Sequence, residues 1–540
     1  MIRSRKSPLK ASDVIENTNN GTSSNKSIGN NFGKKKRSRR SNTNNEVRMS
    51  LPLFLICNLA IGLIVGSIVY YWTNSSSTTT IPGDLVSFVN VLGNKLDAKR
   101  KASFQNFRID PRHPSHSRFF TPVPESSHKT FWYDGERRTF AIARALRSRG
   151  WRKVDKTDEA HLIYSYNNWA GWAAELQPWQ RFNYIPDLEK WNEKSRFAFY
   201  YKQYETKTNS QPSVYVPESY ILTQNKDEIE AFRNVLEGPR NGKNYPWVHK
   251  LSAVNQGKGI TILPPNSQDL LDLPDKALEE LSEHPDHHFN PKEQSIVQQY
   301  ICNEMIWGNQ RKFDVRMYWF VASLDPLIVL YHDGYTRVGN SAYSETTWKD
   351  TRSHLTSHTG LGAETKSSFA LFEQELLEQY ERKPLDQRPN FPPNTSTPIE
   401  HVRNQFKAAL AEMVLIMKDE SFNAPDVNKD DRLSSENGYQ FYCADFIIDN
   451  DFDVWFIEPQ NGCGLDEDYY FRLEMHASMF NGMFDTLEEV STKQELGMTL
   501  LPFDKSGNWE VIYADGQMYE YDGYQRSQNK AGCKVSTEVQ

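Results

Sequence analysis

Two acidic residues toward the C-terminal end of the chain have the spacing of a metal-binding pair. Asp445 and Glu458 stand thirteen residues apart in D-F-I-I-D-N-D-F-D-V-W-F-I-E-P-Q-N-G-C-G, which has the pattern of a strand, a polar turn and a second strand. Such a hairpin brings both carboxylates together, and Gln460 or Asn461 adds a side-chain carbonyl oxygen. A ligand set made only of oxygen favours a hard cation such as Mg²⁺ carrying phosphate oxygens. The alternative is a hairpin whose acidic residues face water.

A lysine and a glycine-rich turn upstream of this hairpin indicate phosphate binding. Residues 247–263 have the pattern of a strand, a loop and a second strand, with Gly257, Lys258 and Gly259 at the tip of the loop. The backbone N–H groups of such a tip can approach phosphates closely, although many such tips are only turns. Lys250 ends an apolar strand, where a lone lysine is rare unless it meets an anion.

The strand expected at residues 311–323 carries its charges on one face. Its even-numbered residues from Lys312 to Tyr318 include Asp314 and Arg316, whereas the odd-numbered residues between them are apolar. Such a face is either a solvated surface or the lining of a site. We favour the lining, because the strand continues into a strongly apolar run that pairs with P-L-I-V-L-Y.

The elements around these residues predict a mixed α/β (α+β) protein. A strand, an amphipathic helix and a second strand alternate in a small N-terminal α/β lobe at 121–185. Further helices are expected at about 190–203, at 369–382 and from Ile399 to Met417. The segment H-D-G-Y-T-R reads as a turn and places Arg337 at the start of a loop.

The cysteines show no recognisable pattern. One lies in an apolar run and four are scattered, namely Cys57, Cys302, Cys443, Cys463 and Cys533. Because no C-x-x-C spacing occurs, the sequence indicates neither a zinc site nor a disulfide framework.

The N-terminal part differs in composition from the rest of the chain. Residues 1–50 hold twelve Lys and Arg against three Asp and Glu and predict a disordered basic tail. Residues 51–72 are apolar, with no charge, and are long enough for a single transmembrane helix. A stalk is expected at 73–120, and the last segment, 501–540, reads as a polar tail without an evident role.

The charges that flank the apolar run predict an orientation. The basic run K-K-K-R-S-R-R precedes it and no early basic residue follows it, so the positive-inside rule places the N-terminus in the cytosol. We therefore expect a type II single-pass membrane protein with a lumenal or extracellular body, in the endomembrane system or Golgi. That body holds 51 Lys and Arg against 66 Asp and Glu, which argues against nucleic acid as a partner.

The order of these motifs resembles the tubulin-tyrosine ligase-like family of ATP-grasp enzymes over about residues 125–490. The motifs, in chain order, are W-V-H-K, G-K-G-I, V-Q-Q-Y-I, R-K-F-D-V-R-M-Y, H-D-G-Y-T-R, H-L-T-S, A-D-F-I-I-D and W-F-I-E-P-Q-N. The resemblance implies an ATP-grasp domain at 186–500 and an ATP-dependent carboxylate–amine ligase. Such an enzyme activates a protein or peptide carboxylate as an acyl phosphate, which the amine of a free amino acid then attacks.

The resemblance also implies a role for each matching residue. The residues implied to bind the nucleotide are Lys194, Lys250, Gly257, Lys258, Gly259, Gln298, Gln299, Tyr300, Ile301, Lys312 and Asp314. The implied Mg²⁺ ligands are Asp445, Glu458 and Gln460, with Asn461 as an alternative donor. Arg316 and Arg337 are the implied catalytic residues, which would bind the carboxylate and the phosphoryl oxygens. Tubulin is a possible acceptor only if the body lies in the cytosol.

Two departures from the family pattern leave other functions open. Gln460 replaces an asparagine, and Ser357 replaces the last residue of H-L-T-N. A non-catalytic ATP-grasp binding module is therefore one alternative. A lumenal glycosyltransferase is the other, because D-N-D-F-D at 449–453 contains a D-x-D, although these residues read as the hairpin turn.

Overall fold

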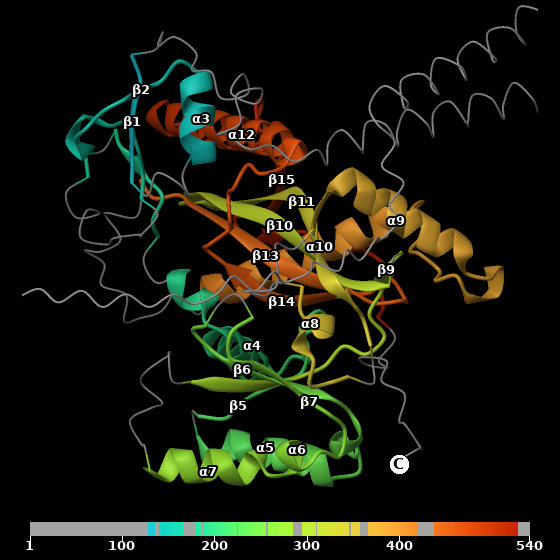
Figure 1. Cartoon of the computed structure of the whole chain (residues 1–540). Helices are drawn as coiled ribbons and strands as arrows, with labels where there is room; N and C mark the ends of the chain where they lie inside the picture. The colour runs from blue at the N-terminus through green and yellow to red at the C-terminus, as the bar shows by residue number, and fades with distance from the viewer. Residues whose placement is uncertain are drawn as a thin grey trace, which may run out of the picture. The chain divides into compact units, whose positions relative to one another are not determined.

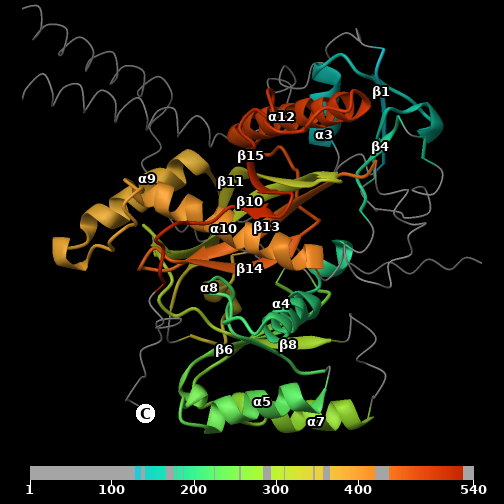
Figure 2. The same ribbon diagram turned by 180° about the vertical axis from the view of Figure 1, so that it is seen from behind.

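Three β-sheets organise the part of the chain that the computed structural model describes (Figures 1 and 2). The described residues are 128–134, 140–165, 176–177, 179–185, 188–223, 225–254, 257–283, 294–308, 310–344, 347–356, 365–419 and 437–526. All of them belong to the compact unit Ser87–Gln540. The expected mixed α/β class is confirmed for this part.

The largest sheet is antiparallel, and its main path runs β14-β13-β10-β11-β15-β16. These strands are β10 (Arg311–Leu324), β11 (Leu327–Ala342), β13 (Gln440–Ile448), β14 (Val454–Gln460), β15 (Glu510–Ala514) and β16 (Gln517–Met518). Two short strands join it at the side, β9 (Ile306–Trp307) on β10 and β12 (Thr365–Ser368) on β11.

Alternation along β10 gives the large sheet two different faces. Val315, Met317 and Trp319 pack into one core with residues of α4 (Lys194–Thr208), α9 (Phe369–Arg382) and α10 (Pro398–Met417). Tyr318 and Phe320 pack into another core with α3 (Phe140–Ser148) and α12 (Tyr470–Glu495). The second face also carries Asp314 and Arg316, because they share the parity of Tyr318.

A second sheet of order β5-β8-β6-β7 faces the large one (Figure 1). Its strands are β5 (Ser219–Ile221), β6 (Trp247–Leu251), β7 (Ile260–Leu263) and β8 (Ser295–Gln299). Trp247 on its outer face packs under α5 (Lys226–Glu237), α6 (Gln268–Leu271) and α7 (Leu273–Glu283). Lys250 and Gln298 point from the inner face instead, where α4 lies between the two sheets.

A third, parallel sheet forms the N-terminal lobe. Its order is β2-β1-β3-β4, with β1 (Thr130–Tyr133), β2 (Arg152–Lys153), β3 (Leu162–Tyr164) and β4 (Arg181–Phe182). Ion pairs join its helix α3 to the region of α12, where Arg144 binds Glu467 and Arg149 binds Asp485. The short helices are η2 (Thr157–Glu159), η4 (Leu188–Asn192), η5 (Gly242–Asn244), α8 (Thr351–His354) and η7 (Leu385–Gln387).

The prediction of a loop at Arg337 was wrong. β11 runs through this position, and Arg337 lies in mid-strand opposite Asp314. The D-G pair that suggested a turn lies in a β-bulge. Arg316 and Tyr318 are two residues apart on β10, but their partners on β11, Tyr335 and His332, are three residues apart. Gly334 fits there because its backbone lies against the carbonyl of Arg316, where a side chain would overlap.

Two further expectations need correction. Cys443 and Cys463 form a disulfide, with their Cα atoms 5.6 Å apart, although their spacing matches no motif. The expected polar tail begins inside the fold, since β15 pairs with β11 and the segment after β16 packs on the hairpin turn. There Arg526 lies over the ring of Trp455, with the guanidinium carbon 3.6 Å from the ring centroid.

We predict that Gly334→Ala destabilises the fold. The new methyl group has to displace the backbone of β10 at Arg316, which should lower the free energy of unfolding by roughly 1–3 kcal/mol or more. Chemical denaturation of the purified protein measures this. Ala342→Ser, at the exposed end of the same strand, is the control and should change stability by less than about 0.5 kcal/mol. Equal stability of both variants would contradict the bulge.

Candidate active site

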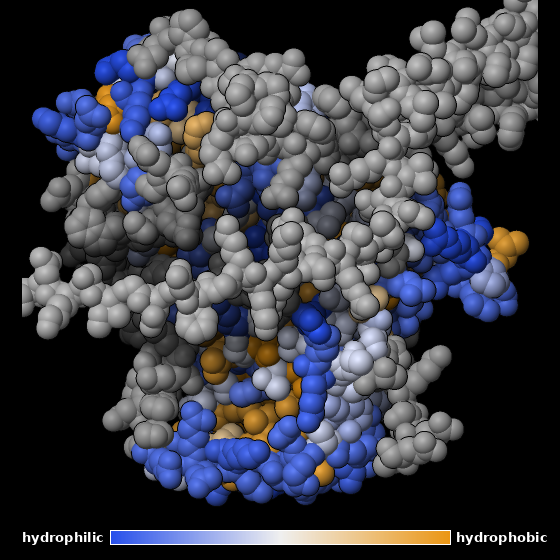
Figure 3. All heavy atoms as spheres, viewed as in Figure 1, coloured by the Kyte–Doolittle hydropathy of each residue, from blue (hydrophilic) through white to orange (hydrophobic). Residues whose placement is uncertain are grey.

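A cavity of about 880 Å³ lies between the inner face of the second sheet and the charged face of the large one. Val248, Ile260 and Ile262 of β6 and β7 form its apolar side, and Ile447 and Ile457 of the hairpin add to it. Hydrophobic residues gather over β6 and β7 in the space-filling view (Figure 3). The cavity therefore combines an apolar side with a densely charged one.

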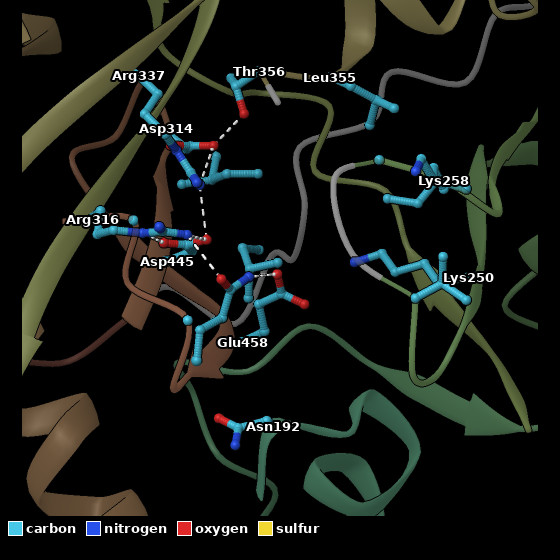
Figure 4. Close-up of a pocket in the computed structure, with 18 of the residues that line it drawn as sticks. Asn192, Lys250, Lys258, Asp314, Arg316, Arg337, Leu355, Thr356, Asp445 and Glu458 are labelled. Atoms are coloured by element: carbon cyan, nitrogen blue, oxygen red, sulfur yellow. Dashed lines mark hydrogen bonds and ion pairs between the residues drawn. The ribbon is translucent and has the colours of Figure 1, made fainter. Parts of the chain in front are cut away.

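The charged side is a buried network of two arginines and two aspartates (Figure 4). Arg316 binds Asp445 with two hydrogen bonds of 2.8 Å, from Nε and from Nη2. Arg337 binds Asp314 at 2.6 and 2.9 Å and also donates to the second oxygen of Asp445 at 2.8 Å. All four residues are buried. We call Glu458, Asp445, Arg316, Asp314 and Arg337 the charged row.

Strand register explains why these residues meet. Directly opposite residues of an antiparallel pair point to the same side of the sheet. Arg316 lies opposite Asp445, Asp445 lies opposite Glu458, and Asp314 lies opposite Arg337. The hairpin expected from sequence thus places its two acidic residues side by side.

The two arginines counteract the effect of burial on the pKa values of the two aspartates. Burial alone would raise the pKa of Asp445, but Arg316 and Arg337 lower it to about 2. Burial raises the pKa of Asp314, and Arg337 opposes this rise. Two guanidinium groups facing two carboxylates compensate one another, which a single buried charge could not achieve.

Glu458 ends the charged row and contacts a cation of another element. Its Oε2 lies 3.2 Å from Nζ of Lys194, the first residue of α4. Gln460 donates to Glu458 through its amide nitrogen and accepts from Nη2 of Arg316 at 3.0 Å through its oxygen. Glu458 and Gln460 are therefore hydrogen-bonded neighbours, and both line the cavity.

Lys250 approaches the cavity from the second sheet. It is buried, and its Nζ donates to Gln298 Oε1 at 2.6 Å. Burial lowers its pKa to about 8, although Glu458 acts in the opposite direction. Lys258 also lines the cavity, on a loop where Gly257 has φ +70° and Gly259 φ +67°. Figure 4 shows Lys250 and Lys258 across the cavity from the arginines.

A hydrogen-bond network joins the strand end at Tyr300 to the large sheet. The Tyr300 hydroxyl lies 2.9 Å from Glu304 Oε1 and 2.9 Å from Nδ1 of His354. Lys312 pairs with Glu304 at 2.8 Å. The segment expected as the nucleotide hinge is therefore fixed to β10 through Lys312.

The structure brings together nearly all residues that the sequence singled out. Every one lines the cavity except Lys194, which contacts Glu458 from beside it, and Gly259, which lies against Leu251. Their roles stay predictions. Thr356 was not singled out, although its motif H-L-T-S was, and its hydroxyl donates to Asp314. Lys366 was also missed, because nothing in its neighbourhood marks it. Ser357 lies outside the described residues.

Three relatives illustrate what the chain is similar to. Protein polyglycylase TTLL10 of Macaca fascicularis is 28% identical over 53% of this chain and 44% of its own length. Inactive polyglycylase TTLL10 of Homo sapiens is 27% identical over 53% of this chain and 40% of its own length. Probable alpha-tubulin polyglutamylase Ttll1 of Tetrahymena thermophila is 28% identical over 37% of this chain and 51% of its own length. The chain spans less than half the length of the first two relatives.

These relatives correct the expected location. A lumenal body was predicted, but relatives named for the modification of tubulin point away from it, because tubulin is a cytosolic protein. Within the described ranges, no helix is long and apolar enough to cross a membrane. The basic tail, the apolar run at 51–72 and the stalk lie outside those ranges. The prediction of a type II membrane protein was wrong.

The family model agrees with the resemblance that the motifs suggested. A model described as tubulin-tyrosine ligase family matches residues 173–461, more than half of the 540 residues. The match includes the second sheet, the strands that hold the charged row and the whole hairpin. The chain therefore belongs to the tubulin-tyrosine ligase family.

Proposed function

We propose that this protein is an ATP- and Mg²⁺-dependent ligase that joins the amine of an amino acid to a protein carboxylate. The observation that carries the proposal is the charged row facing Lys250 and Lys258 across one cavity. Two sheets that enclose such a cavity support an ATP-grasp fold, in which the nucleotide lies between them. Membership of the family supports the same reaction class.

The apolar side of the cavity suits the adenine ring. The segment from Gln298 to Ile301 lines the cavity together with Ile447 and Ile457. The phosphates would then extend toward Lys250 and the Gly257–Gly259 turn, where charge and accessible backbone N–H groups meet.

The donor set next to the phosphates fits Mg²⁺. Glu458 and Gln460 offer hard oxygen donors on one strand, and Mg²⁺ prefers few protein ligands plus phosphate oxygens. Asp445 already accepts three hydrogen bonds from the arginines, and the Gln460 oxygen accepts one from Arg316, so metal binding by either residue requires a rearrangement. When bound, the ion neutralises charge on the phosphate oxygens.

The arginines suit the two chemical steps. A carboxylate oxygen of the acceptor attacks the γ-phosphorus, the bond to the bridging oxygen breaks, and ADP leaves with that electron pair. The amine then attacks the acyl carbon, phosphate leaves, and the released proton passes to solvent. Arg316 and Arg337 line the cavity, and Asp445 and Asp314 fix their orientation, so that positive charge is positioned before the reaction begins.

The acceptor that the relatives suggest is tubulin. Their names include tubulin glycylase and tubulin polyglutamylase, which differ in the amino acid but share the acceptor. We therefore propose a tubulin carboxylate as acceptor for this chain, with purified tubulin as the first substrate to test.

A non-catalytic nucleotide-binding module is the second candidate. The human relative is named an inactive polyglycylase, and Gln460 stands here in place of the family's asparagine. Binding of Mg·ATP in calorimetry without release of ADP, with tubulin and each common amino acid present, would favour this candidate over the ligase.

We predict that Glu458→Gln abolishes Mg²⁺-dependent turnover. The substitution keeps the size of the side chain but removes the charge that a divalent ion needs, so ADP release should fall by roughly 100-fold or more. ADP release with ATP, tubulin and an amino-acid mixture measures this.

Asp451→Asn is the matched control for this experiment. Asp451 is an exposed acid in the turn of the same hairpin and should retain activity within about twofold. An active Glu458→Gln variant beside an inactive Asp451→Asn variant would contradict the assignment of the metal site to Glu458.

We predict that ATP affinity falls as the pH rises through about 8. The Lys250 ammonium of the free protein loses its proton there, and only the protonated form attracts phosphate. Above that pH the affinity should fall by up to roughly tenfold per pH unit. Calorimetric titration of Mg·ATP at about pH 7 and about pH 9 tests this. Lys250→Met should bind weakly at both values, and an unchanged pH dependence in that variant would contradict the assignment.

A further inference from the structure

One end of the disulfide between Cys443 and Cys463 lies beside the charged row. Cys443 stands two residues before Asp445 on β13, so both side chains lie on the same face of the large sheet. It pairs with Gln460 of β14, whose side-chain oxygen accepts from Arg316. The disulfide therefore begins among the residues that we propose for metal binding and catalysis.

The other end of the disulfide reaches the cavity. Residues 461–468 form neither helix nor strand, and at Cys463 this segment is bonded covalently to the large sheet. Cys463 lines the cavity and is 4% exposed, whereas Cys443 is fully buried. A small reagent that enters the cavity therefore approaches the Cys463 end of the bond.

The disulfide also stabilises a contact of a proposed catalytic residue. The carbonyl of Cys463 accepts from Nη1 of Arg316 at 3.2 Å. Gly462 and Gly464 flank Cys463, and both are exposed. Because glycines allow the backbone many conformations, the covalent bond at Cys463 restricts this stretch more than its own residues do. Breaking the bond loosens the stretch that supports Arg316 from one side.

We propose that Cys443 and Cys463 form a thiol-exchange site, through which a small dithiol that enters the cavity converts the protein from a fast to a slow form. The effect on turnover rests on the ligase function proposed above. A ligase that modifies cytosolic tubulin meets cytosolic thiols, and disulfides in that environment usually serve catalysis or redox sensing.

The exchange takes two steps. A thiolate of the dithiol attacks Sγ of Cys463, and the Cys443 thiolate leaves and takes up a proton. The second thiol of the reagent then attacks the reagent's own sulfur in the mixed disulfide. This step releases Cys463 as a thiol and the reagent as a cyclic disulfide, so the protein gains two electrons and two protons.

Reduction of the folded full chain with dithiothreitol tests the exchange itself. The reaction runs without denaturant, is quenched with acid, and is followed by alkylation and peptide mass spectrometry. Cys443 and Cys463 should form a disulfide before treatment and carry the alkyl label after it. A bound non-hydrolysable ATP analogue with Mg²⁺ should slow the reduction by about fivefold or more, because it blocks access through the cavity. Reduction only in denaturant, or a rate unchanged by the bound analogue, would overturn the proposal.

ADP release with ATP, tubulin and an amino-acid mixture measures the effect on turnover. Reduction should lower kcat by about tenfold or more, because Arg316 loses part of its support. Affinity for the ATP analogue should stay within about threefold, since Lys250 and Lys258 belong to the second sheet and its loop. Retained affinity shows that the reduced protein is folded, and reoxidation should restore kcat.

Cys443→Ala/Cys463→Ala is the control for the other three cysteines. The double variant lacks the disulfide, so its kcat should equal that of the reduced wild type, with or without dithiothreitol. A double variant as fast as the oxidised wild type would overturn the proposal, and so would one that dithiothreitol slows further.

Two results separate the thiol-exchange site from the proposed function. If the oxidised wild type releases no ADP, the ligase function fails, while the reduction assay still decides whether Cys443 and Cys463 exchange with a dithiol. If the oxidised and the reduced wild type release ADP at the same rate, the control of turnover by the disulfide alone is overturned.

Discussion

The pairing of Arg316 and Arg337 with Asp445 and Asp314 is the interaction on which the site depends. Four charges are buried between strands, and each is acceptable there only because the others surround it. Removing one partner would leave an uncompensated charge in a poorly solvated place, at a cost of about 3–5 kcal/mol. The same network orients both guanidinium groups toward the cavity, so the requirement of the fold and that of the proposed chemistry coincide.

The surroundings of this network restrict its movement from several directions. The disulfide between Cys443 and Cys463 ties the segment after β14 to β13, and the carbonyl of Cys463 accepts from Nη1 of Arg316 at 3.2 Å. Lys194 approaches Glu458 from α4, which packs between the two sheets. The second sheet contributes Lys250, whose lowered pKa reflects its burial near other cations. Few of these groups can move without disturbing another.

Much of this arrangement could be predicted because it follows from local patterns. Alternation placed Asp314 and Arg316 on one strand face, and the turn residues after Asp445 indicated the hairpin that pairs it with Glu458. The position of Arg337 was missed, because D-G is equally compatible with a turn and with a bulge. The disulfide and Lys366 could not be predicted from spacing, since both depend on segments that meet only through the tertiary fold.

The order of the strands in the large sheet has a consequence for how the chain acquires its structure. β10 pairs with β13 across a separation of 129 residues at Arg316 and Asp445, and β11 pairs with β15 from still further along the chain. Contacts of such long range form slowly, because a large loop must close before they stabilise anything. We expect fragments that stop before β15 to expose an unpaired edge of β11 and to aggregate, so the region from β10 to β15 should be produced as one piece.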